Sequence, residues 1–265
     1  MPSRHVTSER FGANPPTRNR VYDRAVLPPL TIGGSLRYDI VRRRLQELPI
    51  RSVLEIGPGM GALAARLALR YEYVGVELDA ESARIATSRL TRLGRGRIVN
   101  GTSADIDESF DLVCAFEVLE HIEDDASALR EWRERIRPDG WLTLSVPAWQ
   151  SRWGSLDEHA GHFRRYERAQ MRSLLLESGF ERPEVLSYGF PLLTSLQPVW
   201  NALSARGPGL PTLDARTRAS ARFLQPSMWS GYARHAVSLP FAWLQRPFLG
   251  SRRGIGFVVF AQRSD

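Results

Sequence analysis

Short apolar runs alternate with amphipathic segments along the middle of the chain. Runs rich in β-branched and aromatic residues predict strands at 52–56, 72–77, 97–100, 110–116 and 140–146. The segments between and after them carry apolar residues at helical spacing and predict helices at 61–70, 80–93, 124–136 and 167–178. Asp79 suits the N-cap of the second helix, and Pro138-Asp-Gly140 is expected to end the third. Because strands and helices alternate, the expected fold is α/β, with a doubly wound, mostly parallel sheet.

The segments before this alternating region have a different pattern. Residues 1–20 are polar, basic and proline-bearing and are expected to be disordered, and residues 22–35 are expected to form an irregular arm. Residues 36–48 then predict an amphipathic helix, with Tyr38 as a candidate contact over a ligand. We therefore expect an N-terminal arm over residues 1–35.

The segments after the alternating region include two more strands and a long insert. Residues 179–188 and 254–263 predict the sixth and last strands. The residues between these strands are too many for a simple loop, and they predict helices at 192–203, 214–223 and 231–244. The expected units are an arm, a core, a helical lid insert, and the last strand with the C-terminus, at 1–35, 36–189, 190–253 and 254–265.

Composition restricts the chemistry and the partners. The formal net charge is +7, and all 36 basic residues are arginine, so Schiff-base chemistry on lysine is excluded. The arginines are scattered along the chain, so solvated side chains explain the charge better than a nucleic-acid surface does. The single cysteine, Cys114, rules out a disulfide within the chain and favours a reducing cytoplasm. We expect a cytoplasmic protein without a signal peptide or a membrane-spanning helix.

A glycine-rich turn follows the first predicted strand. Gly57, Gly59 and Gly61 stand between this strand and the next predicted helix. Glycines permit positive φ angles and allow a ligand to approach the backbone, and the helix N-terminus favours negatively charged or electron-rich groups. Nucleotide-like cofactors bind at such turns, at the carboxyl ends of parallel strands.

Two classes of cofactor use a turn of this kind. The dinucleotide pattern G-x-G-x-x-G/A is met only weakly, with Ala62 in its last position. The pattern acidic-x-G-x-G-x-G is met fully, because Glu55 precedes the three glycines. A carboxylate at this position would pair with an ammonium group, which NAD lacks. Glu77 ends the next strand, where a ribose would be hydrogen-bonded in either class.

Five segments then share their order and spacing with a known family. VLEIGPGMG, VGVELD, Ser103-Ala-Asp105, FDLVCAFEVLEHI and RPDGWLTLSVP resemble the motifs of class I S-adenosylmethionine-dependent methyltransferases, of the type 11 and 12 kind, over about residues 51–180. Each segment is weak evidence alone, but five in this order are specific. The resemblance implies a seven-stranded Rossmann-like sheet whose last strand inserts antiparallel between the fifth and sixth. It also implies S-adenosylmethionine as the cofactor.

The resemblance also assigns roles in cofactor binding. Glu55 and the glycines would hold the amino-acid end, Glu77 the ribose and Asp105 the adenine amino group. Leu78 and Ile106 would enclose the ring, with Phe116 and Glu117 under the methionine portion. The full expected set is Glu55, Gly57, Pro58, Gly59, Gly61, Glu77, Leu78, Ala104, Asp105, Ile106, Phe116 and Glu117.

The segment Glu117-Val-Leu-Glu120-His121 raises the question of a metal ion. On a helix, positions i, i+3 and i+4 share a face, so Glu117, Glu120 and His121 would converge. Small-RNA 3′-terminal and ubiquinone-pathway O-methyltransferases use E-x-x-E-H to hold a divalent metal, and His159 or His162 would add a ligand. In other members the glutamates order the loop, and the site is expected to work without a metal.

The loop after the fifth strand is aromatic and basic. It lies beyond the carboxyl edge of the sheet, where an acceptor must approach, and the expected substrate contacts are Trp149, Arg164, Arg165 and Tyr166. The alternative, that Arg165 and Tyr166 anchor the loop to the next helix, stays open. The candidate general bases are His121, His159 and His162.

These patterns favour methyl transfer to a small molecule, or to a lipid- or sugar-linked metabolite, by in-line displacement. The alternatives are a metal-assisted RNA or O-methyltransferase and a non-catalytic, membrane-associated protein of the same fold. An NAD dehydrogenase has the least support. Nucleic acid is not the expected partner. A peripheral membrane contact through the 190–253 insert stays open, and the sequence leaves the oligomeric state undetermined.

Overall fold

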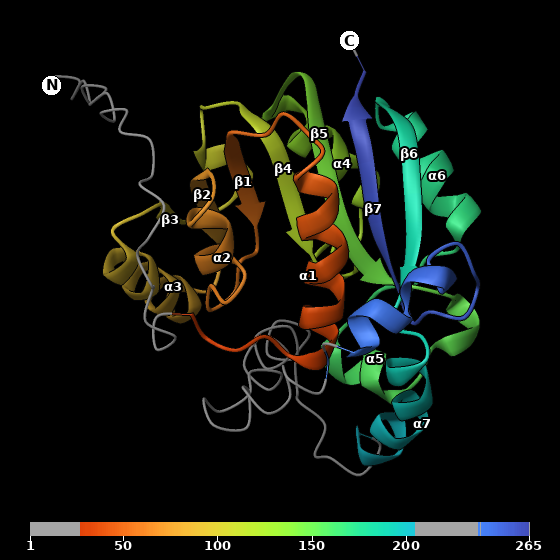
Figure 1. Ribbon diagram of the computed structural model, residues 1–265. Helices are drawn as coiled ribbons and strands as arrows, with labels where there is room; N and C mark the ends of the chain where they lie inside the picture. Colours follow the sequence, from red (N-terminus) through yellow and green to blue (C-terminus); the bar gives the residue numbers. More distant parts are fainter. Residues whose placement is uncertain (1–26, 205–237, 239, 265) are drawn as a thin grey trace, which may run out of the picture.

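The computed structural model describes residues 27–204, 238 and 240–264 (Figure 1). The elements are α1 (Ile32–Leu45), β1 (Ser52–Ile56), α2 (Ala64–Ala68), β2 (Glu72–Glu77), α3 (Ala80–Leu93), β3 (Arg97–Asn100), η2 (Ser103–Asp105), β4 (Phe110–Phe116), η3 (Leu119–His121), α4 (Asp125–Glu134), β5 (Ile136–Pro147), η4 (Gln150–Arg152), α5 (Ser155–Ala160), α6 (Arg168–Glu177), β6 (Phe180–Tyr188), α7 (Leu192–Ser204), η5 (Arg246–Phe248) and β7 (Gly256–Arg263). Residues 240–244 are also helical. The expectations for residues 1–26, for a helix at 214–223 and for residues 231–237 and 239 of the predicted helix at 231–244 lie outside the described residues.

The seven strands form one sheet in the order β3-β2-β1-β4-β5-β7-β6. β1, β2, β3, β4 and β5 pair in parallel, whereas β7 pairs antiparallel with both β5 and β6. The arrows in Figure 1 show β7 running against the other strands. The predicted doubly wound sheet with an antiparallel last strand is therefore confirmed.

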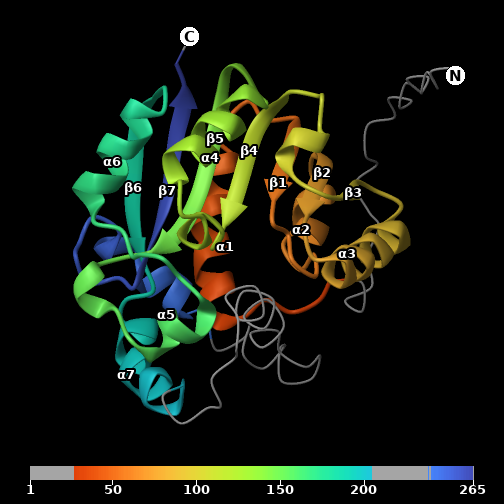
Figure 2. The same cartoon turned by 180° about the vertical axis from the view of Figure 1, so that it is seen from behind.

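Helices cover both faces of the sheet. α1 lies on one face, and α4 and α6 lie on the other, as Figures 1 and 2 show from opposite sides. Two hydrophobic clusters fill the space between these layers. Successive residues of β1 alternate between them, because side chains along a strand point to opposite faces: Val53 packs in the α1 cluster and Leu54 in the α4 cluster. All five positions of β1 are buried, as in a strand covered on both faces of the sheet, and they include the polar residues Ser52 and Glu55.

α1 begins four residues earlier than the sequence predicts. Thr31 caps it, since the Thr31 hydroxyl accepts a hydrogen bond from the Gly34 amide at 2.9 Å. Residues 32–35, expected in the irregular arm, therefore belong to a helix. α2 is shorter than its prediction, because the chain enters it through a turn at 61–63.

β5 also begins earlier than predicted, and the interpretation of Pro138-Asp-Gly140 as the end of a helix is wrong. α4 already ends at Glu134, and Ile136 pairs with Phe110 at the start of β5. The next pair joins Leu112 to Trp141, so β5 has extra residues at this point and its first residues run irregularly along the sheet. An ion pair of 2.7 Å between Arg137 and Asp111 holds this segment.

Segments far apart in the chain meet beyond the carboxyl ends of the parallel strands. α5 and α7 lie there (Figure 1), and the Ser155 hydroxyl donates to the Asn201 carbonyl at 2.6 Å. The buried Gln245 side chain donates to the Leu36 carbonyl at 2.9 Å and accepts from the Gly189 amide at 3.1 Å. The described ends of the 190–253 insert are thus joined to the core, and its role as a lid stays a prediction. No helix in the described part of the chain is long and apolar enough to cross a membrane.

Candidate cofactor and acceptor site

The glycine turn after β1 has the backbone that its sequence predicts. Gly57, Gly59 and Gly61 have φ angles of 65°, 54° and 78°, a region that favours glycine. A Cβ on Gly57 would lie 2.8 Å from a methyl carbon of Val118, so the turn after β4 packs directly against the glycine turn. A Cβ on Gly59 would meet no heavy atom within 4 Å. The backbone around Gly59 is therefore open to a ligand.

Glu77 links the end of β2 to the glycine turn. Its Oε2 accepts from the Gly59 amide at 2.8 Å and its Oε1 from the Asp79 amide at 2.9 Å. Burial raises the pKa of Glu77, and these backbone amides oppose that shift. Each carboxylate oxygen keeps a second lone pair that can accept from a ribose hydroxyl. The next residue, Leu78, is 74% exposed and offers an apolar surface at the same edge.

Glu55 lies behind the glycine turn rather than on its open side. Its carboxylate is buried and accepts a hydrogen bond from the Tyr73 hydroxyl at 2.6 Å. Burial raises the pKa of Glu55 to about 7, and the Tyr73 hydrogen bond and the charge of Arg37 act against this shift. In this conformation Glu55 supports the turn from within the core. Its predicted contact with the amino-acid end of the cofactor stays a prediction.

The raised pKa of Glu55 predicts a dependence of stability on pH. The folded protein binds the proton more tightly than the unfolded chain, so stability falls as pH rises from about 4.5 to about 7. A shift of this size corresponds to about 3 kcal/mol. Glu55→Gln is expected to lessen the decline by up to about this amount, measured by urea unfolding at pH 5 and pH 8. Burial also raises the pKa of Glu77 and Glu120, so part of the decline should remain. Glu72→Gln, an exposed change at the start of β2, is the control and should leave the decline in place.

The expected adenine contacts lie after β3. The exposed Asp105 side chain accepts from the Thr102 amide at 2.8 Å, which closes the short helix η2. Ala104 is exposed beside it. Ile106 is only 1% exposed and packs in the hydrophobic cluster that contains α4. In this conformation Asp105 is accessible to a ligand and Ile106 is not.

Glu117 directly follows β4 and has a strained backbone and three polar partners. Its φ angle is 58°, which is uncommon for a residue with a side chain. Oε1 accepts from the Ser145 hydroxyl at 2.8 Å and the Tyr188 hydroxyl at 3.2 Å, and it pairs with Arg37 at 2.9 Å. None of these three partners was predicted from the sequence. Arg37 resembles every other arginine of α1 in the sequence, and Ser145 and Tyr188 are ordinary strand residues.

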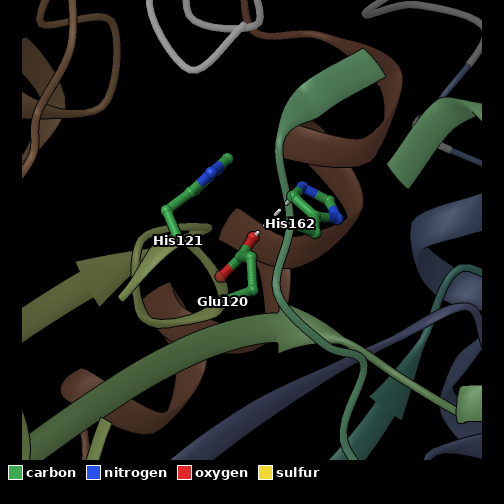
Figure 3. A group of neighbouring side chains, drawn as sticks. All are labelled: Glu120, His121 and His162. Carbon is green, nitrogen blue, oxygen red and sulfur yellow. Dashed lines mark ion pairs between the residues drawn. The ribbon is translucent and has the colours of Figure 1, made fainter. Parts of the chain in front are cut away.

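The expectation that Glu117, Glu120 and His121 share a helix face is wrong. The strained turn at Glu117 precedes the short helix η3, and the Glu117 carboxylate is held by its partners from α1, β5 and β6. Glu120 and His121 instead lie beside His162 (Figure 3). The ligand atoms of these three residues are all within 4.8 Å of one another.

Two of the three candidate bases are neighbours. The rings of His121 and His162 meet edge to face, with centroids 4.8 Å apart. Burial and the nearby His162 lower the pKa of His121 to about 4. His162 Nδ1 lies 2.8 Å from an Asp157 carboxylate oxygen. His159 does not belong to this group, and its Nδ1 faces the Ser155 carbonyl at 3.0 Å. The catalytic roles of all three stay predictions.

The four expected substrate residues are all engaged within the protein. Tyr166 is fully buried and donates to Asp125 at 2.9 Å, while Arg164 pairs with the same carboxylate at 2.7 Å. Arg165 is buried against Asp157 at 2.8 Å. The Trp149 indole donates to the Gly254 carbonyl at 2.8 Å. Arg165 and Tyr166 thus anchor the loop to α5 and α4 rather than to the next helix, α6, and their contact with substrate stays a prediction.

Comparisons with known proteins agree with this geometry. A family model described as a methyltransferase domain matches residues 22–184. A ubiquinone biosynthesis O-methyltransferase from Chromobacterium violaceum is 32% identical over 124 residues, 44% of this chain and 53% of the relative. A trans-aconitate 2-methyltransferase from Deinococcus radiodurans is 31% identical over 105 residues, 39% of this chain and 41% of the relative. The structure of phosphoethanolamine N-methyltransferase 2 from Haemonchus contortus, bound to S-adenosyl-L-methionine, shares the fold with a TM-score of 0.56 at 15% identity, covering 89% of this chain and 54% of that one.

The match to the family model covers more than half of the chain. The chain therefore belongs to the methyltransferase domain family, and within it to the class I S-adenosylmethionine-dependent methyltransferases. This confirms the family that the five sequence segments predict, together with S-adenosylmethionine as the family's cofactor. The chain spans about half the length of the curated relatives it matches.

Proposed function

We propose that this protein transfers the methyl group of S-adenosylmethionine to a small-molecule acceptor. The observation that carries the proposal is the hydrogen bond of 2.8 Å between Glu77 and the Gly59 amide. It brings a carboxylate at the end of β2 to the open side of the glycine turn after β1. A nucleoside bound at the carboxyl ends of these strands could donate its ribose hydroxyls to the Glu77 carboxylate and lie against the open backbone at Gly59.

The other residues at this edge fit the same cofactor. Leu78 offers an apolar surface for the adenine ring, and Asp105 offers a carboxylate for its amino group. Glu117, held by Arg37 and Tyr188, directly follows the neighbouring strand β4. We assign the nucleoside to the ends of β2 and β3 and the amino-acid portion to the region between β1 and β4.

The bound cofactor supplies a methyl group that is already activated by the sulfonium charge. The protein's contribution is then to orient the acceptor and to exclude water. A hydroxyl acceptor would also need a base. His162 suits that role, because Asp157 contacts its Nδ1 and fixes the orientation of the ring. The curated relative named as an O-methyltransferase supports a hydroxyl acceptor.

The test is methyl transfer from labelled S-adenosylmethionine to fractions of a cell extract. We expect label in the small-molecule or lipid fraction with the wild-type protein and none with Glu77→Ala. Label confined to RNA would contradict the proposed acceptor class. Absence of label from every fraction, with cofactor binding intact, would contradict the enzyme assignment.

A further inference from the structure

The loop that joins η5 to β7 lies beside the first turn of α6 (Figure 1). A surface cavity of about 350 Å³ opens there, lined by three arginines, one acidic residue and two apolar residues: Trp149, Glu167, Arg168, Ala169, Arg172 and Arg252. Its volume falls within the range of about 300–1,000 Å³ that small-molecule sites occupy. The glycine turn follows β1, and β4 lies between β1 and β5 in the sheet, so this cavity is separate from the proposed cofactor site.

The guanidinium of Arg168 forms a fixed wall of the cavity. It donates to the Val185 carbonyl at 2.7 Å and to the Ser251 carbonyl at 2.9 Å. Its carbon also lies 5.5 Å from the centroid of the Phe257 ring. The two hydrogen bonds use one N–H of each terminal nitrogen, so the Nε–H and one further N–H of each terminal nitrogen remain as donors.

Arg172 lies one helical turn after Arg168, on the same face of α6. Its side chain is exposed and forms no hydrogen bond or ion pair within the part of the chain that the structure describes. Burial and the nearby charge of Arg172 lower the pKa of Arg168. Like charges held this close repel one another, and an anion between them would remove that cost.

Arg252 reaches the same cavity from the loop before β7. Its guanidinium carbon lies 5.1 Å from the centroid of the Trp149 ring, and stacking of this kind leaves the N–H groups at the edge of the guanidinium available. Arg252 pairs with Glu167 at 3.7 Å, with a side chain that is 82% exposed. An exposed ion pair of this length is weak, so a ligand anion can replace it.

The positive charge of the chain is unevenly distributed. Residues 1–184 contain 27 arginines and 27 acidic residues, whereas residues 185–264 contain nine arginines and a single acidic residue, Asp214. The arginines are spread along the chain, but the acidic residues are not. Arg252 belongs to the segment that carries the whole excess of positive charge, and such an excess raises the local concentration of anions.

We propose that Arg168, Arg172 and Arg252 bind a phosphate monoester in this cavity. The fork of N–H groups on a guanidinium matches two phosphate oxygens, and the dianion offers enough oxygens for all three arginines. A carboxylate, with one charge, compensates less of the repulsion. The remaining volume accommodates part of the esterified group beside Ala169 and the Trp149 indole. This site does not depend on the proposed methyl transfer.

The experiment is titration of the full chain with inorganic phosphate at constant ionic strength, followed by phosphorus NMR. We expect saturable binding, which Arg172→Gln should weaken by about 10-fold because it removes a charge-assisted contact. Since Arg172 makes no contact within the described part of the chain, this variant should keep the melting temperature of the wild type. Glu167→Gln should strengthen binding by about 2- to 5-fold, because it removes the competing carboxylate. Its amide oxygen can still accept from the Gln150 backbone amide.

Arg130→Gln is the matched control. Arg130 is exposed on α4, outside the cavity, and its replacement changes the net charge by the same amount. It should bind phosphate like the wild type. The proposal is overturned if folded Arg172→Gln binds phosphate as tightly as Arg130→Gln does. A weaker affinity in Glu167→Gln than in the wild type would overturn it independently.

A second arm identifies what carries the phosphate. The full chain is sedimented with phosphatidylcholine vesicles prepared with and without phosphatidic acid, whose headgroup is a phosphate monoester. Capture that requires phosphatidic acid and is lost in Arg172→Gln would assign the site to a lipid headgroup. Binding of inorganic phosphate without capture by vesicles would assign it to a soluble phosphate ester. Either result supports the site, and a folded protein that binds neither probe overturns it.

Discussion

Glu77→Ala is expected to weaken binding of S-adenosylmethionine by about 100-fold or more. The carboxylate is positioned by the amides of Gly59 and Asp79, and it would accept charge-assisted hydrogen bonds from both ribose hydroxyls. Each such bond contributes about 1.5–3 kcal/mol, and about 1.4 kcal/mol corresponds to a tenfold change in affinity. The alanine also leaves the Gly59 amide without its acceptor, so the glycine turn loses its link to β2. Isothermal titration calorimetry measures the change.

Glu72→Ala is the control for this prediction. Glu72 begins the strand that Glu77 ends, so it lies at the opposite end of β2 and is exposed. Its loss should leave cofactor affinity unchanged. Circular dichroism would verify that both variants fold. If folded Glu77→Ala binds S-adenosylmethionine like the wild type, the proposed position of the ribose is wrong.

Arg165→Ala is expected to destabilise the fold by about 3–5 kcal/mol while leaving cofactor affinity unchanged. Arg165 is 6% exposed, and its guanidinium pairs with Asp157, which is fully buried. It also donates to the Ala148 carbonyl at 3.2 Å and thus joins the end of β5 to α5. Without the guanidinium, the buried Asp157 carboxylate keeps its contact with His162 but loses its positively charged partner. The loop that carries His162 also loses its anchor. Turnover should therefore fall. Urea unfolding and calorimetry separate the two effects.

Arg164→Ala provides the comparison. Its side chain is 27% exposed, and its partner Asp125 keeps the hydrogen bond from Tyr166, so the expected loss of stability is about 1 kcal/mol or less. An Arg165→Ala protein as stable as the wild type would contradict the anchoring role. If such a protein also bound the acceptor poorly, a direct contact with the substrate would be indicated instead.

The strands that surround the glycine turn were predictable because their signal is local. The observed bounds of the first four strands, β1 to β4, equal those predicted from the sequence pattern. Asp79 caps α3 as predicted. The placement of β7 beside β5 carries no such local signal. It followed only from the resemblance to a family, because strand order depends on contacts between distant segments.

The start of β5 could not be predicted from the sequence alone. It depends on pairing between Ile136 and Phe110. The proline and glycine of residues 138–140 predict a turn there and not a strand. Glu120 and His162 are likewise separated in the chain by α4, β5, η4 and α5, and only the tertiary fold brings them together. Glu117 lies in a strained turn outside η3, which carries Glu120, and helical spacing gave no sign of that turn.

The central claim is that the glycine turn and Glu77 form a binding site for S-adenosylmethionine. Calorimetric titration of the wild-type chain with S-adenosylmethionine, and separately with NADH, tests it most directly. We predict saturable binding of one S-adenosylmethionine per chain and no binding of NADH. A folded protein that binds NADH, or that fails to bind S-adenosylmethionine, would contradict the proposed cofactor site and the residue roles that depend on it.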